Sequence, residues 1–313
     1  MKNQRIGRML AGLGLLALAT VPTTQAVPHT VGAGFTAAQL VDILIPPTSS
    51  ITVVPGSETY STTAAGPTPD TSAIGTFAGG NPSNGLPFGA GVVLTTGRLA
   101  GTGFTDTGTV GPNDHERTTH IWGTPGSTSL QTEFGFPAGT TFDAASLSFM
   151  FSSTATSFSF QYMFGSDEYA ENVGLFNDAF AFLLTDTVSG ITRNIALLPD
   201  LSPVSINTVN SSSHSSYFAA NPQASPSFDI EHDGLAGGGG ANALFASSFI
   251  VPGRVYKIEM VVADSNDAFV DSAVYLAQDS FVDTPHNPVP EPSTYIGAIA
   301  LAGLVANRLR RKK

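Results

Sequence analysis

The sequence predicts an all-β fold, a jelly-roll-like β-sandwich with one short N-terminal helix and a short apolar helix at the C-terminus. Two segments, Phe158–Phe164 and Val255–Val262, place large apolar residues at every second position, which is the period of a strand. Charged residues make up only 12% of the 313 residues, and 33 glycines and 21 prolines favour turns between short strands.

The N-terminal helix is predicted over Thr36–Ile45. Thr36 and Gln39 have the spacing of a capping box, in which each side chain accepts a backbone N–H of the other residue. An apolar face follows, and Pro46 ends the pattern. A strand through Leu40–Ile45 is the alternative, and the capping box disfavours it.

Short apolar or alternating runs bounded by turn residues predict the strands. In chain order these are Ile51–Val54, Gly91–Gly97, Leu147–Phe151, Phe158–Phe164, Phe180–Leu184, Asn194–Leu198, Val204–Asn207, Val255–Val262, Ala273–Ala277 and a last one at Phe281. Ser189-Gly190 is the expected turn of a hairpin, and the polar stretch Gly101–Gly126 is expected to be a loop. The glycines of Ala236–Ala241 indicate a flexible turn. No Lys-Ser/Thr pair of a phosphate-binding loop follows them, which argues against nucleotide binding.

A carboxylate-rich loop connects the predicted strands Phe158–Phe164 and Phe180–Leu184. Five side chains in this loop carry oxygen ligands: Asp167, Glu168, Glu171, Asn177 and Asp178. Hard cations such as Ca2+ prefer clusters of this kind.

A second acidic loop joins the last two predicted strands. It contains Asp264, Asp267 and Asp271, without the Asp-x-Asp-x-Asp-Gly order and terminal Glu of an EF-hand. Like charges this close raise each other's pKa unless a cation or hydrogen bonds compensate. We therefore expect Ca2+ at one or both loops, and a single site shared between them is a further possibility. The alternative is two hydrated acidic turns whose side chains cap backbone groups.

Two other patterns suggest catalysis. His115 and His120 could bind zinc, but the Glu of the zinc-protease helix is missing and the surrounding Pro and Gly residues favour a loop. Glu168 and Glu171 could act as the acid and base of a glycosidase, but cation binding or turn capping is the favoured explanation for this pair. Trp122 is the single tryptophan, which weakens the case for a sugar-stacking platform, though Tyr and Phe can replace it.

Charge and cysteine content exclude further classes. Eight of the 13 basic residues lie at the two ends, which leaves five against 23 acidic residues between Val27 and Pro290. A net charge near −18 over this part argues against nucleic acid as a partner. With no cysteine, the chain forms neither disulfides nor thiolate metal sites.

The N-terminus has the layout of a secretory signal peptide over residues 1–26. Basic residues precede the apolar run Met9–Val21, which is too short for a membrane span. Small residues then lead to a predicted cleavage after Ala26.

The C-terminus, residues 287–313, resembles the PEP-CTERM sorting signal of Gram-negative bacteria. Pro290-Glu291-Pro292 precedes the apolar run Tyr295–Ala306 and a basic tail. Twelve helical residues span about 18 Å, against a hydrocarbon core of about 30 Å, so the segment suits transient anchoring better than permanent anchoring. The basic tail would remain cytoplasmic, with the domain outside. The resemblance implies cleavage by an exosortase, transfer across the inner membrane and export alongside exopolysaccharide.

The central part, residues 27–286, resembles the choice-of-anchor L domain. The resemblance is carried by Gly91–Gly97, Phe164–Phe182, Asn194–Asn210, Asp229–Leu235 and Tyr256–Phe281. Thr95 stands where the family pattern has Ser. This family implies an extracellular domain on anchored bacterial proteins, without a settled activity.

These observations favour an exported, non-enzymatic protein of the cell surface or extracellular matrix, stabilised by Ca2+ and in contact with exopolysaccharide or other surface proteins. A secreted hydrolase acting on glycans through its loop carboxylates is the alternative.

Overall fold

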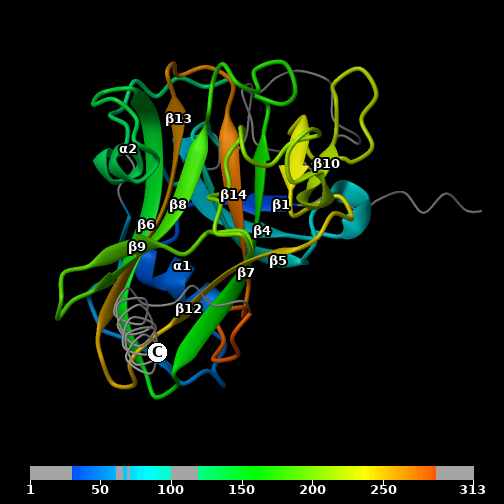
Figure 1. The fold of residues 1–313 in the computed structure, drawn as a ribbon. Coiled ribbons are helices and arrows are strands. Elements are labelled where there is room, and N and C mark those ends of the chain that lie inside the picture. Colours follow the sequence, from blue (N-terminus) through cyan, green and yellow to red (C-terminus); the bar gives the residue numbers. More distant parts are fainter. Residues whose placement is uncertain (1–29, 61–65, 69–70, 100–118, 287–313) are drawn as a thin grey trace, which may run out of the picture.

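The computed structural model describes residues 30–60, 66–68, 71–99 and 119–286. Over these residues the chain forms two antiparallel sheets that pack as a sandwich, so the predicted all-β sandwich is confirmed (Figure 1). The signal peptide, the C-terminal apolar helix and His115 lie outside the described residues. None of the described helices has the length and apolar character needed to cross a membrane.

The larger sheet has eight strands. Its order is β1 (Thr30–Gly32), β4 (Ile74–Ala78), β5 (Ala90–Thr95), β14 (Ser272–Ala277), β7 (Ser157–Ser166), β11 (Gly234–Ala236) and β10 (Phe218–Ala220), while β12 (Leu244–Phe249) also pairs with β7.

The second sheet has six strands. Its order is β2 (Ile51–Val53), β6 (Thr141–Ser153), β13 (Tyr256–Ser265), β8 (Ala179–Asp186) and β9 (Thr192–Asn194), while β3 (Thr59–Tyr60) also pairs with β6. Among the described residues, 3-10 turns lie at Pro82–Asn84 and Ser215–Tyr217.

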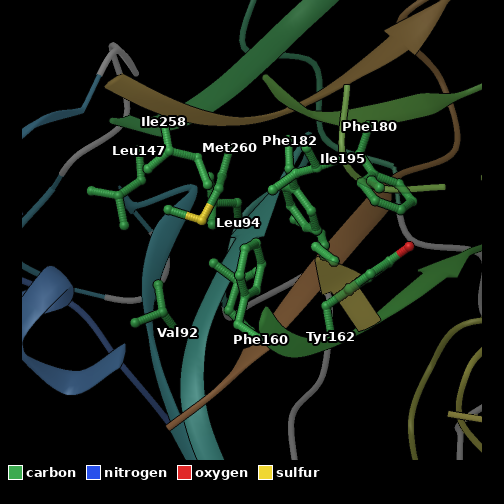
Figure 2. Packing of buried hydrophobic residues seen from close by; sticks show 14 of the residues in the cluster. Val92, Leu94, Leu147, Phe160, Tyr162, Phe180, Phe182, Ile195, Ile258 and Met260 are labelled. Atoms are coloured by element: carbon green, nitrogen blue, oxygen red, sulfur yellow. The ribbon is translucent and has the colours of Figure 1, made fainter. Parts of the chain in front are cut away.

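The core lies between the sheets and is rich in aromatic rings. Figure 2 shows Phe160 and Tyr162 of β7 facing Phe180 and Phe182 of β8. The centroid of the Phe182 ring lies 5.0 Å from that of Phe160 and 4.8 Å from that of Tyr162. The alternating pattern of the sequence therefore selects the buried face of each strand.

Two short helices complete the fold. The first, α1 (Ala37–Leu44), has the predicted capping box, with Gln39 N donating to Thr36 Oγ1 and Thr36 N to Gln39 Oε1. The second, α2 (Thr128–Phe134), was not predicted. Its buried Leu130 packs with Val261 and neighbouring small residues on the outer face of the six-stranded sheet.

Three predicted strands differ from the structure. In place of Asn194–Leu198 the strand is β9, which ends at Asn194. Val204–Asn207 and Phe281 lie in loops that make only isolated bridges, at Ser205 and Val282. Buried aliphatic residues in loops, such as Ile206, gave these segments their strand-like patterns.

The sandwich has two ends of different character. The loops that join β7 to β8 and β13 to β14 lie at one end, which we call the acidic end (top in Figure 1). The turns between β6 and β7, β8 and β9, and β12 and β13 lie at the other, which we call the basal end (bottom in Figure 1).

Candidate functional site

The two acidic loops meet at the acidic end of the sandwich. Asp167 N donates a hydrogen bond of 3.2 Å to Asp271 O, which joins the first loop to the second across about a hundred residues of chain. This contact follows from the pairing of β7 with β14, in which Ser166 lies opposite Ser272. The two loops are therefore neighbours, as a site shared between them would require.

Asp178 is fully buried where the first loop enters β8. Its carboxylate accepts hydrogen bonds from Ser265 N at 2.9 Å and from Ser272 Oγ at 2.7 Å. Burial nonetheless raises the pKa of Asp178 to about 7, and the charges of Asp267 and Asp271 add to the rise against the effect of the two hydrogen bonds.

Asp264 continues the core-facing series of β13 and is fully buried. Among the described residues, neither carboxylate oxygen accepts a hydrogen bond of good geometry, although the nearby Thr96 hydroxyl favours the charged form. Burial, followed by the charges of Asp178 and Asp271, raises the pKa of Asp264 well above its ordinary value. An unsatisfied carboxylate in this position is costly unless it is protonated or paired with a cation.

Asp271 is also fully buried and satisfied on one side only. Its Oδ1 accepts His120 N at 3.0 Å, whereas Oδ2 packs against Gly97 and finds no hydrogen-bond partner in the part of the chain that the structure describes. Burial raises the pKa of Asp271 well above its ordinary value; the His120 N–H opposes this and the charge of Asp167 adds to it. Three buried aspartates at one end thus all favour the neutral form or a bound cation.

The other predicted ligands divide into two groups. Asp167 and Glu168 are buried, and Asp167 Oδ1 accepts Asp233 N at 2.9 Å. Glu171 is exposed, Asn177 Oδ1 accepts Asn207 N at 2.9 Å, and Asp267 Oδ1 accepts Phe269 N at 3.1 Å. Asp267, which accepts a backbone N–H from two residues further along, behaves as a turn-capping side chain of the simpler interpretation, whereas Asn177 links its loop to the segment at Asn207.

The described residues offer no three His, Asp or Glu side chains arranged to hold a metal ion together. A cation here would therefore depend on two carboxylates completed by main-chain, hydroxyl or water oxygens. His120 is half-buried with its ring 4.3 Å, edge-on, from that of Trp122. Burial and then the charge of Arg98 lower the pKa of His120.

Comparison with known families identifies the family of the chain. The model of the choice-of-anchor L domain matches residues 29–282, which include both acidic loops and all the described strands. The chain belongs to the choice-of-anchor L family. The PEP-CTERM protein-sorting motif matches residues 288–313, so this choice-of-anchor L protein is an exported surface protein processed by an exosortase. Neither the curated proteins nor the solved structures give a significant match.

One structural residue of this choice-of-anchor L domain was missed from the sequence. Asp143 lies at a bulge of β6 with a left-handed φ of 47° and is 1% exposed. Its carboxylate accepts Trp122 N at 3.0 Å and Thr124 N at 2.8 Å. Trp122 Nε1 in turn donates to Gly97 O at 2.7 Å. Asp143 thereby fixes the segment that covers Asp271, and no local pattern around it predicts this role.

The choice-of-anchor L domain also carries a groove of about 510 Å³ beside α2. Its floor includes Glu259 and Val261, which alternate with core-facing residues of β13 and so lie on the outer face of the sheet. Five hydroxyl side chains and Tyr60, which also packs against the core, line it as well: Thr124, Ser127, Thr128, Ser129, Ser146 and Tyr60. Ser129 Oγ donates to Glu259 Oε1 at 3.3 Å. Its lining comes from separate stretches of chain, which sequence patterns do not bring together.

Proposed function

We propose that this protein is a non-enzymatic component of the surface or extracellular matrix of a Gram-negative bacterium, and that it binds exopolysaccharide through the groove beside α2. The family and the sorting motif support the location. The observation that carries the binding role is the composition of the groove, where hydroxyl groups surround one carboxylate.

This composition suits a neutral or amino sugar. Sugar hydroxyls can exchange hydrogen bonds with the Ser and Thr side chains, and the Glu259 carboxylate can accept from two of them. A uronic acid would meet the negative charge of Glu259 and of the acidic domain, so we expect it to bind less well.

Retention on the producing cell's own exopolysaccharide tests the proposal. We expect Glu259→Gln to weaken retention of the exported protein at least tenfold. Glu58→Gln, a nearby carboxylate that does not line the groove, is the matched control and should bind normally. Equal retention of all variants, or none by the parent protein, would reject polysaccharide binding at this groove.

We further propose that Ca2+ binds at the acidic end through Asp264 and Asp271. A divalent cation would satisfy the three oxygens of Asp264 and Asp271 that accept no hydrogen bond from the described residues, and it would offset the mutual repulsion of the buried aspartates. Of the eight expected ligands we propose this pair, because both carboxylates are fully buried and incompletely hydrogen-bonded among the described residues.

Calorimetry and thermal unfolding of the whole exported chain test the Ca2+ site. At a hundred times its Kd, Ca2+ would stabilise the fold by about 2.7 kcal/mol. Asp264→Asn should abolish both the heat of binding and the stabilisation, whereas Glu171→Gln, exposed in the neighbouring loop, should leave both unchanged. Heats equal to buffer dilution for the parent chain would eliminate the site.

We assign no catalytic role to Glu168 and Glu171, which would be the acid and base of the alternative hydrolase. Glu168 is 1% exposed and Glu171 is exposed, so the two do not share a cleft environment of the kind that a glycosidase needs. Release of reducing sugar by the parent protein and its loss in Glu168→Gln would overturn this assignment.

Finally, we propose that the segment Tyr295–Ala306 holds the protein transiently in the inner membrane until an exosortase cleaves near Pro290-Glu291-Pro292. The apolar run and basic tail support this arrangement. Mass spectrometry of the released protein should find Val27 at its start and no peptide beyond the cleavage region; an intact tail on the released protein would contradict it.

A further inference from the structure

Exposed apolar side chains gather at the basal end of the sandwich. Two belong to the turn between β8 and β9, and two to the end of β12 and the turn that follows: Val188 (74% exposed), Ile191 (45%), Phe249 (42%) and Val251 (40%). Arg193 Nη2 joins the two groups through hydrogen bonds to Ser248 Oγ at 2.8 Å and Phe249 O at 2.9 Å. They therefore form one surface, which we call the basal patch.

Basic residues accompany the basal patch. Between Val27 and Pro290 the sequence has only five Lys and Arg residues, and three of them, Arg193, Arg254 and Lys257, lie at this end. Arg254 pairs with Asp186 at 2.6 Å, and Lys257 is exposed. Because the domain is otherwise strongly acidic, the basal end is where an anionic surface meets least repulsion.

The described chain also ends at this side. His286 N donates to Ser247 Oγ at 3.0 Å, and its ring stacks on Phe245 of β12 with centroids 3.8 Å apart. From His286 to Tyr295, where the apolar run of the sorting segment begins, a fully extended chain spans about 30 Å. A tether of this length lets the basal end reach the bilayer while the sorting segment is inserted.

We propose that the basal patch docks on the anionic membrane surface while the sorting segment remains uncleaved. This rests on the transient anchoring proposed above. The apolar side chains would enter the headgroup region, and each basic residue near an anionic surface adds about fivefold to the affinity. Such contacts are weak alone, but the short tether supplies a high effective concentration. Cleavage removes the tether, so the domain leaves the membrane without any change of its fold.

The absence of cysteine from the sequence allows a direct test with single labelled cysteines. Full-length Val188→Cys and Val251→Cys report on the basal patch, and Leu175→Cys and Phe269→Cys, at 66% and 53% exposure in the loops of the acidic end, are the matched controls. Each carries an environment-sensitive dye and is reconstituted into phosphatidylglycerol–phosphatidylcholine vesicles that contain a headgroup nitroxide quencher. Circular dichroism confirms that each variant is folded.

We expect at least threefold stronger quenching at Val188→Cys and Val251→Cys than at the two controls, and a smaller difference in pure phosphatidylcholine or at high salt. Equal quenching at both ends, with the protein floating with the vesicles, would overturn the docking and leave the anchoring intact. Failure of the full-length chain to float would overturn both. If the dyes at Val188→Cys and Val251→Cys are already shielded from water without vesicles, the patch is a contact between two copies of the chain. That result would reject the membrane as its partner.

Discussion

Replacing Asp178 by Asn should remove much of the pH dependence of folding stability. Burial raises the pKa of Asp178 from an ordinary value of 3.8 to about 7 in the folded protein. The folded state then holds a proton that the unfolded state has lost, so between these two pH values stability falls as pH rises. At 1.36 kcal/mol per pH unit, the loss due to this one group is about 4 kcal/mol.

This loss is large beside the total stability of a typical domain, about 5–15 kcal/mol. Asn cannot ionise, so the stability of Asp178→Asn should be about 4 kcal/mol less sensitive to pH between pH 4 and pH 8. The amide oxygen can still accept Ser265 N, and its NH2 group can donate to Ser272 Oγ, which itself hydrogen-bonds Ser166 Oγ at 2.8 Å. The substitution therefore tests the charge with little change in packing.

Urea unfolding in EDTA at several pH values measures the effect, because EDTA removes divalent cations that would mask the repulsion. Glu171→Gln, exposed in the same loop, is the control and should follow the parent protein. The reasoning would be refuted if the parent protein gained stability from pH 4 to pH 8, or if Asp178→Asn kept the full slope of the parent.

Three further substitutions test the packing. The buried Tyr162 hydroxyl makes no hydrogen bond within the described part of the chain, so Tyr162→Phe should raise the free energy of unfolding by about 1 kcal/mol, measured in urea. Gly97→Ala should push Asp271 away, lower the melting temperature and change the fluorescence of Trp122, which bonds Gly97 O. Thr36→Ala removes the N-cap of α1 and should cost about 1 kcal/mol, whereas no change would show that the helix is held by its packing alone.

The sequence predicts the elements whose pattern is local. Strands such as β7 and β13 alternate over many residues, so the face that packs in the core is visible before folding. The capping box at Thr36 and Gln39 is likewise complete within four residues and located α1 correctly. Because few segments have a helical pattern, the many predicted strands then favour a sandwich.

The elements that depend on distant contacts escape such reasoning. The helix α2 has seven residues and a single buried side chain, Leu130, whose partners lie on β8 and β13. The Asp143 carboxylate accepts the backbone N–H groups of Trp122 and Thr124 only because a β-bulge and a left-handed backbone direct it toward them. The acidic loops could be recognised from their carboxylates, but the complete burial of Asp264 depends on how the two sheets close.

The arrangement of the two ends has a consequence for the proposed Ca2+ site. The strand β13 runs from the basal end to Asp264, and its ten residues cover about 33 Å. Screening in physiological salt has a length of about 8 Å, so anionic lipids at the basal end act only weakly on the buried aspartates. Ca2+ affinity measured on the anchored full-length chain should therefore equal that of the chain free in solution. An affinity that rises with the fraction of anionic lipid would show instead that the acidic end faces the bilayer. The docking orientation, and the argument from the length of β13, would then have to be abandoned.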